Sequence, residues 1–264
     1  MAGSLLVTFL VSALGCASTV PLKTGAPPLV SPPRYGVAQQ PLGPINTVVL
    51  DAGHGGHDPG TAHFGLKEKY LALEIARQLR QQLEEAGLTV IMTRETDQFI
   101  PLSSRPALAN RLEADLFISI HINANRDRQV SGVEVYYPRE SLVSPSAQWP
   151  PSVSPAEVGI PSTTVKQVLW DLVLGRTRTQ SRRLASSICH SMRGGLQVSC
   201  RGIKPARFVV LREAWMPAVL VEVGYVSNQE EAARLGTAAY RQAIAQSVAE
   251  GILSYIRDLG VQHI

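Results

Sequence analysis

Short runs of apolar, often β-branched residues alternate along this chain with longer stretches in which apolar residues recur every four positions. The runs typical of buried strands are 47–51, 88–92, 116–120 and 218–223. Two amphipathic stretches are typical of helices, one over 67–86 and one over 240–256. Buried strands that alternate with helices indicate an α/β fold with a largely parallel central sheet. We therefore predict a single α/β domain in which helices flank this sheet.

Five further features follow from weaker patterns. They are the end of the first long helix at Gly87, a serine-capped helix over about 103–113, an edge or half-exposed strand over 133–136, a helix over 165–192 that breaks near Gly175, and a strand over 207–211. Glycine commonly follows the end of a helix, and serine is a favoured N-cap.

The composition fits a folded domain, because 45% of the residues are hydrophobic and 17% are charged. A chain with this many apolar residues can bury a core, which excludes a mainly disordered protein. The apolar stretch near the N-terminus is shorter than the roughly 20 residues that span a bilayer, which excludes a polytopic membrane protein. The net charge of +4 is compatible with nucleic acid, anionic lipid or an anionic wall polymer as partner.

The first 44 residues are predicted to be a leader and a tether. Residues 1–18 hold a short apolar run followed by small residues, the pattern of a secretory signal peptide. Their Ala-Leu-Gly-Cys ending resembles a lipobox, in which Cys16 becomes the lipidated N-terminus. Residues 19–44 are proline-rich and should form an extended tether before a globular part at 45–264. We expect export to the periplasm or cell envelope, either anchored to the membrane through Cys16 or released by ordinary cleavage.

Polar side chains stand where three of the predicted strands end. His54 follows the first strand, while His121 and Glu222 stand at the ends of two later strands. Glu68 begins the first long helix, which starts from the same edge of the sheet. Open α/β sheets bind ligands at the carboxyl ends of their strands. We therefore expect these four side chains to meet in one site.

Two histidines and one carboxylate form a ligand set of catalytic zinc sites, with water in the fourth position. The candidate ligands in this chain are His54, Glu68 and His121. His57 and His63 lie in the same glycine-rich loop as His54 and compete with it as ligands. Glu68 also has a simpler interpretation, as a carboxylate favoured by the dipole at a helix N-terminus.

Glu222 interrupts an otherwise apolar strand, where an acidic side chain is costly without a role or a partner. Beside a zinc site it could act as the general acid and base. The alternative is a buried salt bridge to one of the many arginines. From the residue pattern alone, the chain is predicted to be a metallohydrolase of the α/β class.

Four groups of residues, in a fixed order, carry a family resemblance. They are VLDAGHGG (49–56) with DPG (58–60), KEK (67–69) with MTR (92–94), SIHINA (119–124), and LVEVGYVSN (220–228). These groups resemble the motifs of zinc-dependent N-acetylmuramoyl-L-alanine amidases, the cell-wall amidases of the cell-separation type. The resemblance covers about residues 45–258, nearly all of the globular part.

The resemblance implies a mixed sheet of about six strands and a single Zn²⁺ ion. It implies that His54, Glu68 and His121 are zinc ligands and that Glu222 is the catalytic glutamate. The implied reaction is hydrolysis of the amide between N-acetylmuramic acid and L-alanine in peptidoglycan. A water activated by zinc would attack the carbonyl, and Glu222 would carry the proton to the leaving amine.

Relatives that act in cell division carry an inserted helix that blocks the zinc until an activator protein binds. The matching region of this chain contains a Pro/Ser-rich insertion at 141–164, and 164–172 resembles the end of the blocking helix. We predict that 141–175 covers the site until a protein activator displaces it. The alternative is a solvated loop without a regulatory role.

Basic residues gather between positions 176 and 207, where they could contact an anionic wall polymer or form a solvated face. They are Arg176, Arg178, Arg182, Arg183, Arg193, Arg201, Lys204 and Arg207. Cys189 and Cys200 could pair in an oxidising compartment, although the sequence alone does not show that they meet. Nucleic acid is not expected as a partner, because the chain carries no nucleic-acid motif.

Two other functions stay open at this point. A zinc carboxypeptidase acting on another wall peptide bond would use the same metal chemistry, so only substrate assays would separate it from an amidase. A catalytically silent wall-binding lipoprotein would usually lack a ligand or the acid/base residue, whereas all four positions are filled here.

Overall fold

The computed structural model describes residues 45–139 and 163–261. The predicted signal peptide at 1–18, the tether at 19–44 and nearly all of the insertion at 141–164 lie outside these residues. Within the described ranges, no helix has both the length and the hydropathy needed to cross a bilayer.

A central sheet, a small hairpin and flanking helices make up the described chain. The strands of the central sheet are β1 (Thr47–Ala52), β4 (Thr89–Met92), β5 (Leu116–Asn123), β6 (Val133–Pro138), β7 (Cys200–Ala206) and β8 (Ala218–Tyr225). The hairpin strands are β2 (Ala62–His63) and β3 (Leu66–Lys67). The helices are α1 (Glu68–Glu85), α2 (Ser104–Arg111), α3 (Thr163–Leu196), α4 (Val209–Arg212), α5 (Gln229–Leu235) and α6 (Ala238–Val261).

The six-stranded sheet has the order β4-β1-β5-β8-β6-β7. Strands β4, β1, β5 and β8 run parallel to one another, whereas β6 is antiparallel to β8 and parallel to β7. The sheet is therefore mixed and mostly parallel, which confirms the predicted fold class. Because β1, β5 and β8 run in the same direction, their carboxyl ends meet at one edge of the sheet.

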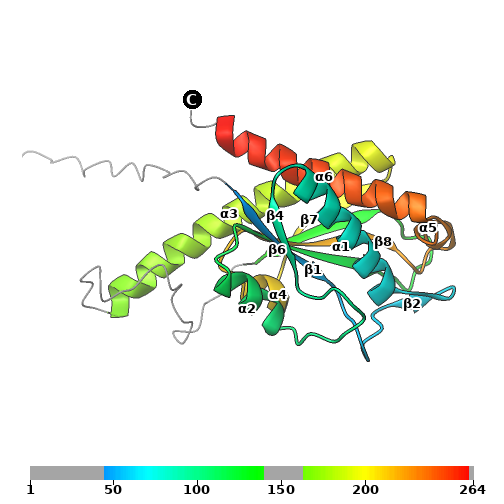
Figure 1. The fold of residues 1–264 in the computed structure, drawn as a ribbon, viewed down its shortest axis with the longest axis horizontal. Coiled ribbons are helices and arrows are strands. Elements are labelled where there is room, and N and C mark those ends of the chain that lie inside the picture. The colour runs from blue at the N-terminus through cyan, green and yellow to red at the C-terminus, as the bar shows by residue number, and fades with distance from the viewer. Residues whose placement is uncertain (1–44, 140–162, 262–264) are drawn as a thin grey trace, which may run out of the picture. The chain divides into compact units, whose positions relative to one another are not determined.

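Helices cover both faces of the sheet, with α1, α3 and α6 on one face and α2 and α4 on the other (Figure 1). Alternate residues of β1 follow this division. Val48 and Leu50 belong to the core under α1, α3 and α6, whereas Val49 packs with Phe117 and Leu211 on the opposite face. Successive strand residues point to opposite faces. A strand that is covered on both faces must therefore be apolar along its whole length, which explains the continuous apolar runs in the sequence.

The strand predicted at 133–136 is present as β6, but it is not an edge strand, because it lies between β8 and β7, and its first three residues are buried and not half-exposed. The edge strand on this side of the sheet is β7, whose sequence CRGIKPA contains a glycine and a proline and has no apolar period. An edge strand tolerates proline because one side of its ladder needs no partner.

The predicted strand at 207–211 is also wrong: α4 begins within it and buries Val210 and Leu211 in the second core. A short apolar run does not distinguish a strand from a helix by its pattern.

Helix α3 runs without interruption from Thr163 to Leu196, so the predicted break near Gly175 is wrong. A single glycine costs a helix only about 1 kcal/mol, which tertiary packing can offset.

The predicted end of α1 at Gly87 is confirmed, because Gly87 has a φ of 89° and follows the C-cap residue Ala86. The predicted serine-capped helix is present as α2, although Ser103 makes no side-chain capping bond.

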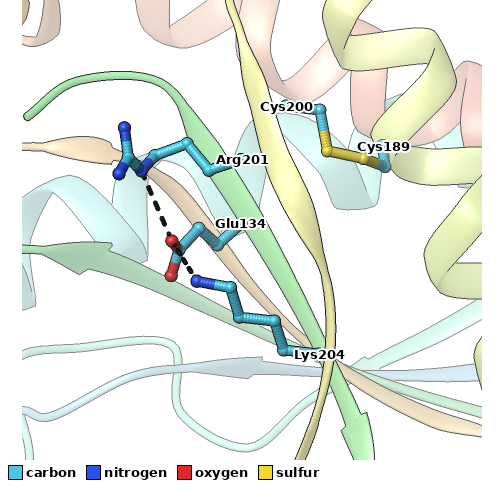
Figure 2. Close-up of a disulfide and its surroundings, with 5 residues drawn as sticks. All are labelled: Glu134, Cys189, Cys200, Arg201 and Lys204. Carbon is cyan, nitrogen blue, oxygen red and sulfur yellow. Dashed lines mark hydrogen bonds and ion pairs between the residues drawn. A yellow bond between two sulfur atoms is a disulfide. The ribbon is translucent and has the colours of Figure 1, made fainter.

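A disulfide joins Cys189 of α3 to Cys200, the first residue of β7 (Figure 2). The two Cα atoms lie 5.9 Å apart, inside the range that disulfides span. The pairing that the sequence left open is therefore present in the structure. It connects a helix that packs on one face of the sheet to the edge strand.

Candidate active site

The structure brings three of the predicted site residues together at the carboxyl edge of the sheet. His54 lies in the loop after β1, Glu68 is the first residue of α1, and His121 lies near the end of β5. One ligand atom from each residue lies within 4.8 Å of the other two. The position of each side chain follows from the β-strand or helix terminus that carries it.

Glu68 is the centre of this group and is almost completely buried. Its Oε1 lies 2.8 Å from His121 Nδ1 and 3.2 Å from His54 Nε2. Its Oε2 accepts hydrogen bonds from the backbone N–H and the hydroxyl of Thr61, at 2.8 and 3.1 Å. Burial alone would raise the pKa of Glu68, but the hydrogen bonds and charges of His121 and His54 outweigh burial and lower the pKa far below its usual range. Glu68 is therefore held as a carboxylate.

His54 is oriented by a second carboxylate, because its Nδ1 lies 2.7 Å from Asp58 Oδ2. Nε2 is therefore the ring nitrogen that faces Glu68. Burial lowers the pKa of His54, but Glu68 and Asp58 outweigh this effect and raise the pKa above its ordinary value. A metal-binding histidine usually donates the N–H of its other ring nitrogen to a carboxylate or carbonyl, which fixes the orientation of the ring.

Two glycines allow the side chains of this group to approach the backbone. A Cβ atom at Gly53 would overlap the His121 ring, and one at Gly60 would overlap Glu68 and His54. Gly60 also has a φ of 65°, where a side chain would be strained. The donor set and its tight backbone cradle fit a divalent metal such as zinc, because imidazole and carboxylate donors are the groups zinc uses.

His57 and His63, which competed with His54 as candidate ligands, do not belong to this group. The His57 ring lies against Phe99 with centroids 4.2 Å apart, and the His63 ring lies 6.3 Å from the Phe64 ring. The residue pattern could not separate the three histidines, because only the path of the loop decides which one faces Glu68, whereas the family resemblance singled out His54.

Glu222 lies beside His121 in the sheet, because the two residues are register partners on β8 and β5. Strand β8 continues three residues beyond it to Tyr225, so Glu222 stands inside the strand and not at its end. Its Oε2 is buried without a hydrogen-bond partner, and it forms no ion pair with any residue of the described ranges. Burial, followed by the charges of Glu68 and Glu134, raises the pKa of Glu222 well above its usual value. The alternative of a buried salt bridge to an arginine therefore has no support in these residues.

A buried polar network beneath the site was not predicted from the sequence. Arg94 donates to the carbonyls of Ala52 and Gly53 at 2.9 and 2.7 Å, and Arg105 donates to the carbonyl of His54 at 2.9 Å. These bonds fix the backbone that carries the first histidine.

Asp51 supplies the charge that balances this network. Its carboxylate accepts bonds from Arg105 at 2.9 Å, from Thr93 at 2.7 Å and from Ser119 at 2.7 Å. The side chains of Asp51 and Arg105 are 0% and 2% exposed, so the pair is fully desolvated. The available signal in the sequence was an acidic residue at the end of an apolar strand.

Comparison with known proteins places this geometry in a family. Residues 48–254 match the family Amidase_3, described as N-acetylmuramoyl-L-alanine amidase. The N-acetylmuramoyl-L-alanine amidase AmiA of Escherichia coli is 37% identical over 217 residues, which cover 79% of this chain and 75% of that protein. AmiC of Neisseria meningitidis is 37% identical over 79% of this chain, but the match spans only 52% of AmiC.

Solved structures agree with the sequence matches. The amidase AmiC2 of Nostoc punctiforme has a TM-score of 0.63 at 30% identity, over 80% of this chain and 97% of that one. The CwlD amidase of Clostridioides difficile, in complex with the GerS lipoprotein, has a TM-score of 0.65 at 25% identity, over 81% of this chain and 99% of that one. The family match, the curated relatives and the fold agree, and the chain belongs to the N-acetylmuramoyl-L-alanine amidase family.

Proposed function

We propose that this protein is a zinc-dependent peptidoglycan hydrolase that cleaves the amide between N-acetylmuramic acid and L-alanine. The family match supports the reaction, because the relatives carry the name of this activity. The observation that carries the proposal is the meeting of His54, Glu68 and His121 beside Glu222, whose buried Oε2 has no hydrogen-bond partner among the described residues.

In this proposal His54, Glu68 and His121 hold one zinc ion. When bound, zinc lowers the pKa of a water molecule and polarises a carbonyl group. Asp58 keeps the His54 ring in the orientation that directs Nε2 to the site. Thr61 fixes the second oxygen of Glu68, so that Oε1 is the oxygen that faces both histidines.

Glu222 moves the proton in this scheme. Burial and the charges of Glu68 and Glu134 raise the pKa of Glu222, so its carboxylate takes up a proton more readily than an ordinary glutamate does. Glu222 would take a proton from the attacking water and deliver it to the amine of L-alanine as the amide breaks. No described residue donates a hydrogen bond to Glu222 Oε2, so no protein group competes for the proton that this carboxylate would carry.

The cellular setting belongs to the same proposal. We place the protein in the periplasm or cell envelope, exported by residues 1–18 and tethered by 19–44, with lipid attachment at Cys16 as one route to the membrane. We also propose that residues 141–175 restrain the enzyme until a protein activator binds. The complex of a family member, CwlD, with a lipoprotein gives a precedent for a protein partner.

The restraint is tested by deletion. Removing 141–164 should increase the rate of peptide release from peptidoglycan if this segment covers the site. An unchanged rate would favour a solvated loop.

The substrate is tested by analysing the products. Purified protein with Zn²⁺ is incubated with intact peptidoglycan, and the released fragments are identified by mass spectrometry. Stem peptides that begin with L-alanine would establish the amidase. Loss of a terminal amino acid would indicate the zinc carboxypeptidase instead. Absence of any product, with and without 141–164, would favour the silent wall-binding lipoprotein.

A further inference from the structure

Glu134 and Glu222 are opposite partners on neighbouring strands, so two carboxylates lie side by side in the sheet. Glu134 of β6 pairs with Glu222 of β8, and Glu222 pairs in turn with His121 of β5. Directly opposite residues of an antiparallel pair share a face, with Cβ atoms about 4.5–5.5 Å apart. Like charges in such positions are destabilising. Glu134 therefore lies close enough to affect the residue proposed to move the proton.

In the described residues, the groups that offset this repulsion between carboxylates contact Glu134 and not Glu222. Its carboxylate accepts hydrogen bonds from Lys204 Nζ at 2.6 Å and from the Tyr136 hydroxyl at 2.5 Å, and Arg201 Nε lies 3.5 Å away (Figure 2). Glu222 receives none of these contacts, although it is only one strand further from β7. The two carboxylates therefore differ: Glu134 contacts two cations and a hydroxyl, whereas no described residue donates a hydrogen bond to Glu222 Oε2.

The charge states of the pair agree with these contacts. Burial alone would raise the pKa of Glu134, but the hydrogen bonds from Lys204 and Tyr136 outweigh it and lower the pKa. The pKa of Glu222 is raised, and the Glu134 charge is one of the causes.

A register shift in β7 explains how two cations reach the same carboxylate. Strand β7 has one residue more than β6 in the interval beside Glu134. Gly202 lies in this interval with a φ of 130°, a conformation that glycine adopts without strain. Bulges of this kind change the direction of side chains. The shift allows Arg201 and Lys204, three residues apart, to bind from the same side.

The disulfide anchors the strand that carries both cations. Cys200 is the first residue of β7 and is joined to Cys189 of α3, and Arg201 is the next residue along the strand (Figure 2). Edge strands have only one neighbour in a sheet, so a covalent link restrains a part of the fold that otherwise depends on pairing with β6.

We propose that Glu134 is a positioning residue for Glu222: by binding Lys204 and Arg201, it keeps both cations away from the Glu222 carboxylate. This inference rests on the proposed role of Glu222 in proton transfer. A lysine side chain is a point charge on a flexible four-carbon stem and can change partners. Without the Glu134 charge, Lys204 would turn to Glu222 and hold its carboxylate in an ion pair.

The kinetic test compares Glu134→Gln with the double variant Glu134→Gln/Lys204→Met on soluble peptidoglycan fragments. The single variant should lose at least about tenfold in kcat with KM little changed, because acid–base catalysis contributes about 10²–10⁴-fold. The double variant should recover at least about threefold over the single variant, since Lys204, the cation that lies closer to Glu134, is gone while Arg201 remains. Near wild-type activity of Glu134→Gln, or no recovery in the double variant, would overturn the proposal.

Glu231→Gln is the matched control for a merely structural loss. Glu231 is also a buried glutamate, and it accepts bonds from the backbone N–H groups of Gly132 and Tyr225 at 2.9 and 2.7 Å. It makes no contact with Lys204, so Lys204→Met should not restore any activity that Glu231→Gln loses. Recovery in this background as well would mean that Lys204 acts independently of Glu134, against the proposal.

A crystal structure of the Glu134→Gln variant tests the inference without an activity measurement. Lys204 Nζ should lie within about 4 Å of a Glu222 oxygen, the ion-pair limit. Lys204 remaining on residue 134 or pointing into solvent would overturn the proposal. This readout also separates the two proposals. If neither the wild-type protein nor the variant without 141–164 releases stem peptide, the proposed function fails, but the position of Lys204 still decides the role of Glu134.

Discussion

The carboxylate of Asp58 lies 2.7 Å from Nδ1 of His54, and Nε2 of the same ring lies 3.2 Å from Glu68. The two nitrogens of one imidazole therefore have separate partners, one outside the site and one inside it. Asp58 restricts the rotation of the ring and favours a proton on Nδ1, which leaves Nε2 as the nitrogen that can bind a metal.

Removing Asp58 should weaken metal binding without unfolding the protein. We expect Asp58→Ala to bind Zn²⁺ about 10–100-fold more weakly, the usual effect of losing such a partner. Competition with a chelator of known affinity measures this change. Asp258→Ala, at an exposed position on α6, is the matched control and should bind zinc as the wild type does. Equal affinity of both variants would show that Asp58 does not orient the ligand.

Removing Asp51 should lower the free energy of unfolding more than removing a charge at the surface does. Asp51→Ala leaves Arg105 buried without its ion-pair partner, and breaking such a pair typically costs about 3–5 kcal/mol. Urea unfolding followed by circular dichroism gives the change in the free energy of unfolding. The comparison variant is Arg80→Ala, which removes the exposed Arg80–Glu95 pair and should change this free energy by less than about 1 kcal/mol. Similar values for both variants would contradict the structural importance of the buried network.

Removing the disulfide should lower stability by a moderate amount. The two cysteines are 11 residues apart in the chain, and closing a loop of this size contributes about 3 kcal/mol in the chain-entropy view. We expect the double variant Cys189→Ser/Cys200→Ser and the reduced wild type to lose similar amounts in thermal unfolding at neutral pH. A reducing agent that leaves the melting temperature of the wild type unchanged would show that the bond is absent in solution.

The contacts of Glu134 with Lys204, Arg201 and Tyr136 should stabilise the fold only while the Glu134 carboxyl is ionised. Burial raises the pKa of this group, but the bonds from Lys204 and Tyr136 reverse the effect and lower it below the ordinary value of 4.5. A group with a lowered folded-state pKa contributes stability above its unfolded pKa, and this contribution is lost as the pH falls through the folded pKa. The free-energy difference between wild type and Glu134→Gln should therefore be larger at pH 7 than at pH 3. A difference that does not change with pH would contradict the ion-pair account.

Much of the site could be predicted because its residues stand where strands and a helix begin or end. His54, Glu68 and His121 each lie at or near such a terminus, and parallel strands bring their ends to one edge. Glu222 was recognisable as a lone acid in an apolar strand. The local pattern did not show which of the three loop histidines faces Glu68, because nothing in it fixes the path of the glycine-rich loop; the family resemblance selected His54.

The missed features depend on contacts between distant parts of the chain. Strand β7 has no apolar period, since it needs only backbone pairing with β6 and exposes polar side chains. Arg105 was assigned only to a helix, yet it reaches Asp51, 54 positions away. The same applies to Glu134 and Lys204, which are 70 positions apart. No local signal in the sequence connects such pairs.

Zinc content and turnover measured in the same samples test the central claim most directly. The variants are Glu68→Gln, which removes a proposed ligand, and Glu222→Gln, which removes the proposed acid/base group. Glu222→Gln should retain one zinc ion per chain, while its release of stem peptides falls by at least about 10²-fold. Glu68→Gln should lose both zinc and activity, because a catalytic zinc site needs all three protein ligands. Full activity of Glu222→Gln, or unchanged zinc affinity of Glu68→Gln, would contradict the account.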